Sequence, residues 1–154
     1  MPFSLPFGVS YTRATRTPHA GELRVDATEA QNARVLVIDD DDDLRALAVR
    51  VVKQAGYAVD SVADGQGGLD RLTKQTYDLI VCDLRMPGMN GVAFYRAVER
   101  RNPVMARRVV FMTLHSSSDE YRDFLRGVYA PVLNKPFTLD EFRAMVARMV
   151  GPRR

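Results

Sequence analysis

The sequence predicts an α/β domain with a five-stranded parallel sheet and five helices. Short apolar runs, typical of buried strands, alternate with segments whose apolar residues recur at helical spacing. Four of these runs end directly in a reactive side chain, which is a carboxylate twice, then a hydroxyl, then an amine. Strands that alternate with helices form parallel sheets with right-handed crossovers. Such sheets carry their chemistry just beyond the carboxyl ends of the strands.

The length and composition indicate one globular domain with additional residues at the ends. The chain has 154 residues, which is enough for a single core. Its formal net charge is +3, but the arginines are scattered in pairs and form no basic stripe. We therefore expect a solvated surface rather than direct nucleic-acid binding. The single cysteine, Cys82, excludes an internal disulfide and is interpreted as a packing residue.

The ends of the chain differ from its centre. Residues 1–33 contain Pro2, Pro6 and Pro18 among Ser, Thr and Gly. We predict a disordered N-terminal extension there, with a short strand or a docking peptide as the alternative. Residues 151–154 form a basic tail. No segment is long and apolar enough to span a membrane, and the N-terminus is a poor signal peptide, so we expect the cytoplasm and no membrane contact.

The first elements of residues 34–150 follow from apolar spacing and from residues typical of helix ends. Strands are predicted at 34–38, 58–62 and 77–82. A helix is expected after the first strand, capped by Asp42 or Asp43 and ended by Gly56. The helix predicted at 64–74 contains three glycines, each costing up to about 1 kcal/mol relative to alanine. We expect this helix to be short or mobile.

The later elements continue the alternation. Apolar runs at 108–112 and 131–134 predict the last two strands. A helix is predicted at 91–100, and another begins at Ser118 with two acids in its first turn, where they suit the helix dipole. The last helix is capped by Thr138, and its stripe of Leu, Phe, Val and Met is interpreted as core.

Four motifs carry a resemblance to a known family. In chain order they are IDDDDDLR, DLRMPGMNG, FMTLH and LNKPF. This set resembles the receiver domain of two-component response regulators over about residues 34–150, and it suggests a stand-alone receiver. The resemblance implies a flavodoxin-like fold with strand order 2-1-3-4-5, in which the first and third strands lie side by side at the switch point. Asp39, Asp40 and Asp83 would then converge on one pocket.

A metal ion is expected in this pocket. Three carboxylates close together repel one another unless a cation lies among them. Oxygen ligands favour Mg²⁺, with Mn²⁺ as a substitute. The resemblance implies that Asp40 and Asp83 ligate the ion directly, that Asp39 acts mainly through water, and that the backbone carbonyl of Arg85 supplies another ligand. Asp41, Asp42 and Asp43 are interpreted as a solvated turn that caps a helix.

The resemblance also implies the reaction and its residues. Asp83 is the expected nucleophile, which takes a phosphoryl group from a phosphohistidine. The Lys135 ammonium would stabilise the charge of the transferred group, and Thr113 would bond it and so switch the conformation. The Lys135–Pro136 peptide bond is expected to be cis. The protein would catalyse only its own phosphorylation and dephosphorylation and would not otherwise be an enzyme.

Three residues depart from the family pattern. Val132 stands where an aromatic switch partner is often found, so the coupling of Thr113 to an aromatic ring is in question. Leu114 is bulky where a small residue is common, which narrows access to the phosphoryl site. His115 either touches the phosphoryl group or faces solvent. The segment 130–137 is more similar to receivers fused to hybrid histidine kinases than to those of transcription factors.

The expected partners are a histidine kinase or phosphotransfer protein and a downstream protein effector, and the resemblance allows a homodimer. An alternative is a receiver fold that serves as a scaffold without phosphorylation. A third hypothesis is a Mg²⁺-dependent phosphatase of the haloacid-dehalogenase type, which needs an acid two residues after its nucleophile, where Arg85 stands here. Direct DNA binding is supported only by the arginine content.

Overall fold

The computed structural model describes residues 33–114 and 116–151. The strands are β2 (Arg34–Ile38), β3 (Ala58–Val62), β4 (Leu79–Asp83), β5 (Val109–Thr113) and β6 (Val132–Asn134). The helices are α2 (Asp42–Gln54), α3 (Gly65–Lys74), α4 (Gly91–Arg101), α5 (Pro103–Ala106), α6 (Asp119–Gly127) and α7 (Leu139–Val150). The predictions for residues 1–32, for His115 and for the basic tail from residue 152 lie outside the described residues.

The five strands form one parallel sheet in the order β3-β2-β4-β5-β6. In chain order this is 2-1-3-4-5, so the expected flavodoxin-like topology is confirmed. The order reverses at β2, whose neighbours on its two sides are β3 and β4. Loops that leave β2 and β4 at their carboxyl ends therefore open a crevice between them.

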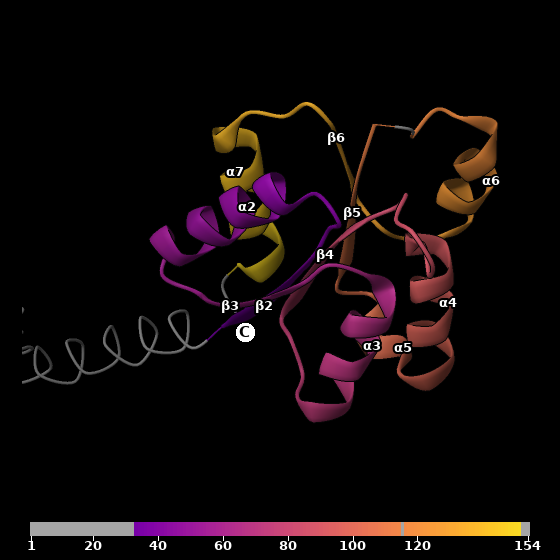
Figure 1. The fold of residues 1–154 in the computed structure, drawn as a ribbon, viewed down its shortest axis with the longest axis horizontal. Helices are drawn as coiled ribbons and strands as arrows, with labels where there is room; N and C mark the ends of the chain where they lie inside the picture. The colour runs from indigo at the N-terminus through magenta and orange to yellow at the C-terminus, as the bar shows by residue number, and fades with distance from the viewer. Residues whose placement is uncertain (1–32, 115, 152–154) are drawn as a thin grey trace, which may run out of the picture.

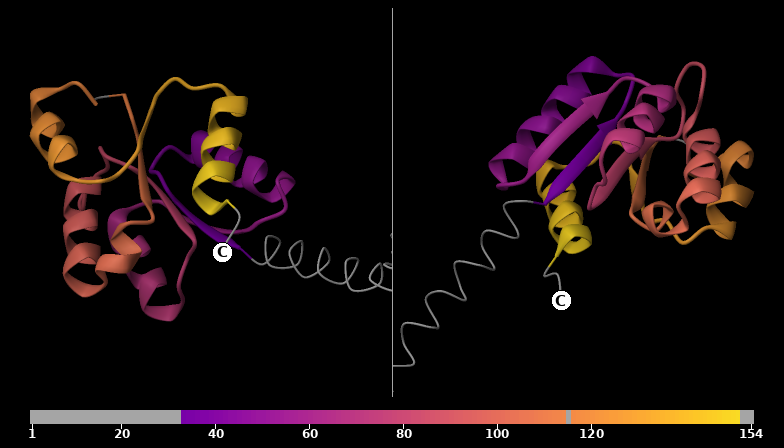
Figure 2. Two further views of the ribbon diagram at one scale, coloured as in Figure 1. Left: turned by 180° about the vertical axis from the view of Figure 1, so that it is seen from behind. Right: turned by 90° about the horizontal axis from the view of Figure 1, so that it is seen from below.

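Helices cover both faces of the sheet. Helices α2 and α7 lie on one face, and α3, α4, α5 and α6 lie on the other (Figures 1 and 2). Two apolar clusters fill the two interfaces, and β2, β4 and β5 contribute alternate side chains to each. Parallel strands buried on both faces need continuous apolar runs, which is the pattern that predicted them.

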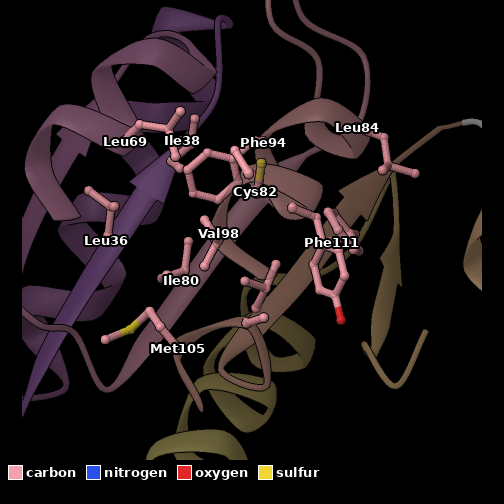
Figure 3. Packing of buried hydrophobic residues seen from close by; sticks show 14 of the residues in the cluster. Leu36, Ile38, Leu69, Ile80, Cys82, Leu84, Phe94, Val98, Met105 and Phe111 are labelled. Carbon is pink, nitrogen blue, oxygen red and sulfur yellow. The ribbon is translucent and has the colours of Figure 1, made fainter. Parts of the chain in front are cut away.

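The larger cluster surrounds Phe94 of α4. Its ring packs near Ile38 and Cys82 from two adjacent strands (Figure 3). Cys82 is fully buried, which confirms its interpretation as a packing residue, and burial raises the pKa of its thiol well above the usual range. Gly68 of α3 meets the same ring, because a Cβ at this position would lie 2.8 Å from Phe94 Cε1 and 2.6 Å from Ile38 Cδ1. Thus the glycine that weakens α3 also lets the helix pack closely.

The structure corrects three details of the prediction. Asp41, and not Asp42 or Asp43, caps α2, because its carboxylate accepts hydrogen bonds from the N–H groups of Asp43 and Leu44 at 3.0 and 3.1 Å. The short helix α5 was not expected; it begins at a proline and is capped by Asn102. Strand β4 starts two residues later than predicted and includes Asp83. Helix ends depend on which backbone N–H groups a side chain reaches, which spacing alone does not specify.

A close backbone approach fixes the start of α4. A Cβ on Gly91 would lie 2.6 Å from the carbonyl oxygen of Asp83 and 2.8 Å from Cα of Leu84. We expect Gly91→Ala to lower the free energy of unfolding by about 1–3 kcal/mol, because backbone atoms must move to admit the methyl group. Urea unfolding followed by circular dichroism measures this change.

Gly127→Ala is the matched control. Nothing lies within 4 Å of a Cβ at this position, and the residue is helical. This variant should be neutral or more stable by up to about 1 kcal/mol. Equal effects of the two substitutions would contradict the proposed role of the close contact at Gly91.

Candidate functional site

The candidate site lies where four strands end at the same edge of the sheet. Asp39 directly follows β2, Asp83 is the last residue of β4, Thr113 is the last residue of β5, and Lys135 directly follows β6. These residues are separated by as many as 96 positions in the sequence. Parallel strands bring them together because their carboxyl ends all point the same way.

Three carboxylates meet in this site. Asp39, Asp40 and Asp83 each offer an oxygen, and these oxygens lie within 4.8 Å of one another. Asp39 and Asp83 are buried and Asp40 is exposed, so the cluster opens to solvent on one side. A set of carboxylate oxygens with access to water fits a hard divalent cation such as Mg²⁺, which prefers oxygen ligands and retains waters.

The Lys135 ammonium lies between two of these acids. Its Nζ is 3.1 Å from Asp39 Oδ2 and 3.3 Å from Asp83 Oδ2, and only 13% of its side chain is exposed. The backbone N–H of Lys135 donates to the carbonyl of Thr113 at 2.9 Å, which joins the ends of β5 and β6. The Lys135–Pro136 peptide bond is cis, as predicted.

Burial and charge act on the pKa values of both members of this pair. Burial raises the pKa of Asp83 to about 6, an effect that Lys135 opposes and Asp39 reinforces. Burial lowers the pKa of Lys135, but the attraction of Asp83 and Asp39 outweighs it, so the net shift is upward. At neutral pH the lysine is therefore protonated and Asp83 is ionised.

Asp39 has both carboxylate oxygens engaged. Oδ1 accepts the backbone N–H of Asp41 at 2.9 Å, and Oδ2 accepts Lys135. Its backbone carbonyl oxygen accepts a hydrogen bond of 2.7 Å from Nη1 of Arg45. Nη2 of the same arginine donates a hydrogen bond of 2.7 Å to Asp42 Oδ1. Arg45 thus holds the turn that carries Asp39 and Asp40. Sequence reasoning missed it, because an arginine on an acidic helix gives no signal that it returns to the preceding strand.

Thr113 lies next to the acids on the adjacent strand. Asp83 is paired with Met112 in the β4–β5 ladder, so Thr113 is one residue further toward the loops. Its side chain is buried. The loop that follows is tied to the neighbouring strand, since the Ser116 hydroxyl donates to the side-chain oxygen of Asn134.

An apolar groove of about 420 Å³ adjoins the site. Its residues are Asp41, Asp43, Leu44, Leu47, Leu114, Lys135, Pro136 and Phe137. Leu114 is 66% exposed and lines the groove beside the lysine. It therefore borders the approach to the site as an apolar surface, and the predicted narrowing of access remains a prediction.

The family of the chain follows from its match to known proteins. Residues 35–147 match the family model described as the response regulator receiver domain. The chain belongs to this receiver family. As a receiver it is a signalling component of two-component or phosphorelay systems, whose receivers bind Mg²⁺ in an acidic pocket and interact with histidine kinases or phosphotransfer proteins and with effectors. None of the helices within the described residues is long and apolar enough to cross a bilayer.

Similar proteins share this receiver and differ in length. The probable chemotaxis protein CheY of Rhizobium etli is 32% identical over 126 residues, covering 79% of this chain and 95% of that protein. The DNA-binding transcriptional regulator NtrC of Klebsiella pneumoniae is 34% identical over 115 residues, covering 75% of this chain and 24% of NtrC. The chain thus spans about a quarter of the length of NtrC.

A solved receiver with a ligand is also similar. The structure of the response regulator TrrA from Thermotoga maritima in complex with Mg²⁺-BeF has a TM-score of 0.65 and 25% identity. It covers 76% of this chain, and 98% of that chain is matched. The particular resemblance to receivers of hybrid histidine kinases stays a prediction.

The raised pKa of Asp83 makes a prediction about this receiver. The ordinary value of 3.8 applies to the unfolded chain, and the folded value is about 6. Between these values the folded protein keeps a proton that the unfolded chain has lost, so the ionised acid destabilises the fold as pH rises through this window. At neutral pH without divalent cations, Asp83→Asn should be more stable than the wild type by about 3 kcal/mol.

Urea unfolding at several pH values measures this difference. The advantage of Asp83→Asn should grow from about pH 4 to about pH 6 and then stay constant. Asp123→Asn, which changes an exposed acid of α6, should show no such growth. A lower stability of Asp83→Asn at neutral pH would contradict the assigned direction of the shift.

Proposed function

We propose that Asp83 accepts a phosphoryl group from a phosphohistidine in a Mg²⁺-dependent reaction, and that the receiver then signals by a conformational switch. The observation that carries this proposal is the convergence of three acids and one ammonium from the ends of three strands. Asp83 is the buried acid of the cluster that ends a central strand, and Lys135 holds one of its oxygens.

The reaction needs positioning more than covalent help. A carboxylate oxygen of Asp83 bonds to phosphorus as the bond from phosphorus to the imidazole nitrogen breaks, and the freed histidine takes a proton from water. A divalent cation held by the acidic cluster would neutralise charge on the phosphoryl oxygens. Lys135, whose Nζ lies 3.3 Å from Asp83 Oδ2, would donate hydrogen bonds to the phosphoryl oxygens. The Arg85 N–H, 3.4 Å from Asp83 Oδ1, keeps the nucleophile oriented.

The three acids are proposed to bind the ion in different ways. Asp40 is exposed and Asp83 reaches the same opening, so we assign these two as direct ligands of Mg²⁺. We assign Asp39 a role through water, because its two oxygens accept hydrogen bonds of 2.9 and 3.1 Å, whereas those that Asp83 accepts are longer, at 3.4 and 3.3 Å. The carbonyl of Arg85 completes the protein ligands, and Mn²⁺ would substitute because the ligands are all oxygen atoms.

Thr113 and the loop after it carry the signal outward. Its hydroxyl would donate to the phosphoryl group on Asp83 and draw the loop inward. Val132 is half-buried and pairs with Phe111, whose ring packs against Tyr95 and Phe124 with centroids 5.9 and 5.5 Å away. Aromatic rings of α4 and α6 thus fill the region that an aromatic residue at position 132 would share. We infer that the response passes through α6.

The apolar groove is the proposed contact surface for the phosphodonor. A donor histidine must come within bonding distance of Asp83, and the exposed apolar side chains beside Lys135 offer burial to a protein that brings it. We propose a histidine kinase or phosphotransfer protein as this donor, a downstream protein as effector, and the cytoplasm as the compartment. No direct nucleic-acid contact or catalysis beyond the protein's own phosphoryl chemistry is expected, and a homodimer is a further expectation.

Phosphorylation by a small donor tests the function. With Mg²⁺ and acetyl phosphate, intact mass should increase by one phosphoryl group in the wild type and in the control Asp123→Asn, an exposed acid of α6, and Asp83→Asn should remain unmodified. Removal of Mg²⁺ with a chelator should abolish the product. An unmodified wild type, or equal modification of Asp83→Asn, would refute the proposal.

Lys135→Met tests the role of the ammonium. We expect the rate of phosphorylation by acetyl phosphate to fall about 100-fold, the effect typical of losing one charge-stabilising group. The variant should also be less stable without Mg²⁺, because two buried acids lose their cation. Lys53→Met, on the exposed end of α2, is the control that should change neither rate nor stability. A Lys135→Met rate equal to that of Lys53→Met would argue against this role.

A further inference from the structure

Arg85 contacts the candidate site and helix α6 with different parts of the same residue. Its backbone N–H lies 3.4 Å from Asp83 Oδ1. Its guanidinium Nη2 lies 3.0 Å from Glu120 Oε1 in the first turn of α6, and its central carbon lies 5.9 Å from the ring centroid of Tyr121. Through these contacts the loop after β4 reaches the start of α6. Nothing in the reaction described above uses this side chain.

The Arg85–Glu120 ion pair is exposed and therefore weak. Its two side chains are 56% and 55% exposed, and pairs of this kind contribute little to stability. Tyr121 beneath it is buried, and its pKa is raised by burial and then by Glu120, with Asp83 adding a smaller effect. The Arg85 charge opposes this upward shift of the Tyr121 pKa, so the charges of Asp83, Arg85 and Glu120 all act on the Tyr121 hydroxyl.

The first turn of α6 is weakly capped. Ser118 occupies the cap position, but its side chain makes no capping hydrogen bond. Its hydroxyl oxygen is buried and has no hydrogen-bond partner among the described residues. A buried hydroxyl without a partner is unfavourable, so a shift of this turn that satisfies it costs little. The Arg85–Glu120 pair connects this weakly capped turn to the loop after β4.

We propose that a phosphoryl group on Asp83 takes the Arg85 guanidinium from Glu120 and so releases the first turn of α6. The inference rests on the proposed phosphorylation of Asp83. A phosphoryl group carries more charge than a carboxylate and accepts two parallel hydrogen bonds from a guanidinium.

The other cations near the site are less free to make this exchange. Lys135 is already shared by Asp39 and Asp83, and Arg45 is bound to the Asp39 carbonyl and to Asp42. The side chains of Lys135 and Arg45 are 13% and 20% exposed, against 56% for Arg85. Because the Arg85 side chain is exposed, it can change its partner without leaving a buried charge unpaired.

Binding of beryllofluoride with Mg²⁺ to the full chain tests the exchange. Glu120→Gln should bind beryllofluoride about two- to five-fold more tightly than the wild type, because no ion pair must be broken, and this range corresponds to exposed pairs. Affinity is measured by ¹⁹F NMR titration. The Arg85 side-chain Nε–Hε signal should shift on binding in the wild type, which a merely structural role would not produce.

Asp119→Asn is the matched control. It removes the same charge from the same helical turn, but Asp119 pairs with Arg122 of its own helix at 2.6 Å. Its affinity should equal that of the wild type. In an Arg85→Gln background, Glu120→Gln should have no effect on affinity.

Three outcomes separate the hypotheses. If the wild type binds beryllofluoride and Glu120→Gln behaves like Asp119→Asn, the exchange is wrong and phosphorylation of Asp83 stands. If Glu120→Gln tightens binding equally in the wild type and in the Arg85→Gln background, the effect is general electrostatics and the exchange is again wrong. If the wild type shows no binding with Mg²⁺ present, the proposed function itself fails.

Discussion

The rest of the structure depends on compensation of negative charge at one edge of the sheet. Two buried carboxylates, Asp39 and Asp83, share the Lys135 ammonium at 3.1 and 3.3 Å. A buried ion pair adds little net stability, because removing both charges from water offsets their attraction, whereas removing one partner is strongly destabilising. The main role of this ion pair is therefore to position charge in the site. One ammonium cannot neutralise three acids, and the remaining negative charge is what a divalent cation would offset.

The parallel sheet makes this arrangement possible. Its strands are apolar on both faces and are anchored by two separate clusters, so their ends are held rigidly. The reactive residues come from these ends and from the turns directly after them, not from long loops. Supports such as Arg45 and the cap of Asp41 restrict the turn after β2. Asp83 is an exception, because ionising this buried carboxylate costs free energy of folding. Its raised pKa reflects that cost.

Helix α6 contrasts with this rigid edge. The caps of α2, α3, α4 and α7 make side-chain hydrogen bonds, whereas Ser118 at the start of α6 makes none. The helix nevertheless packs buried aromatic rings against the sheet. An element with a firm apolar face and a loosely held first turn is suited to move as a unit when a nearby charge changes. Its position beside the loop after β5 connects this property to the acidic site.

The sequence by itself determined the strands and the chemical groups at their ends. The apolar runs stop at Asp39, Asp83, Thr113 and Lys135. Such patterns involve residues that are neighbours in the chain, so they can be read from the sequence without the fold. The family motifs then supplied the strand order and the grouping of the acids, and the structure agrees with both.

The tertiary structure alone decided the supporting contacts. The bond of Arg45 to the Asp39 carbonyl, the pairing of Arg85 with Glu120 and the closeness of Gly68 to Phe94 join residues without any fixed spacing. The choice of Asp41 over its two neighbours as the cap depended on which carboxylate reached free N–H groups. Such contacts depend on the relative placement of whole elements, because side-chain hydrogen bonds and close packing form only within a few ångströms.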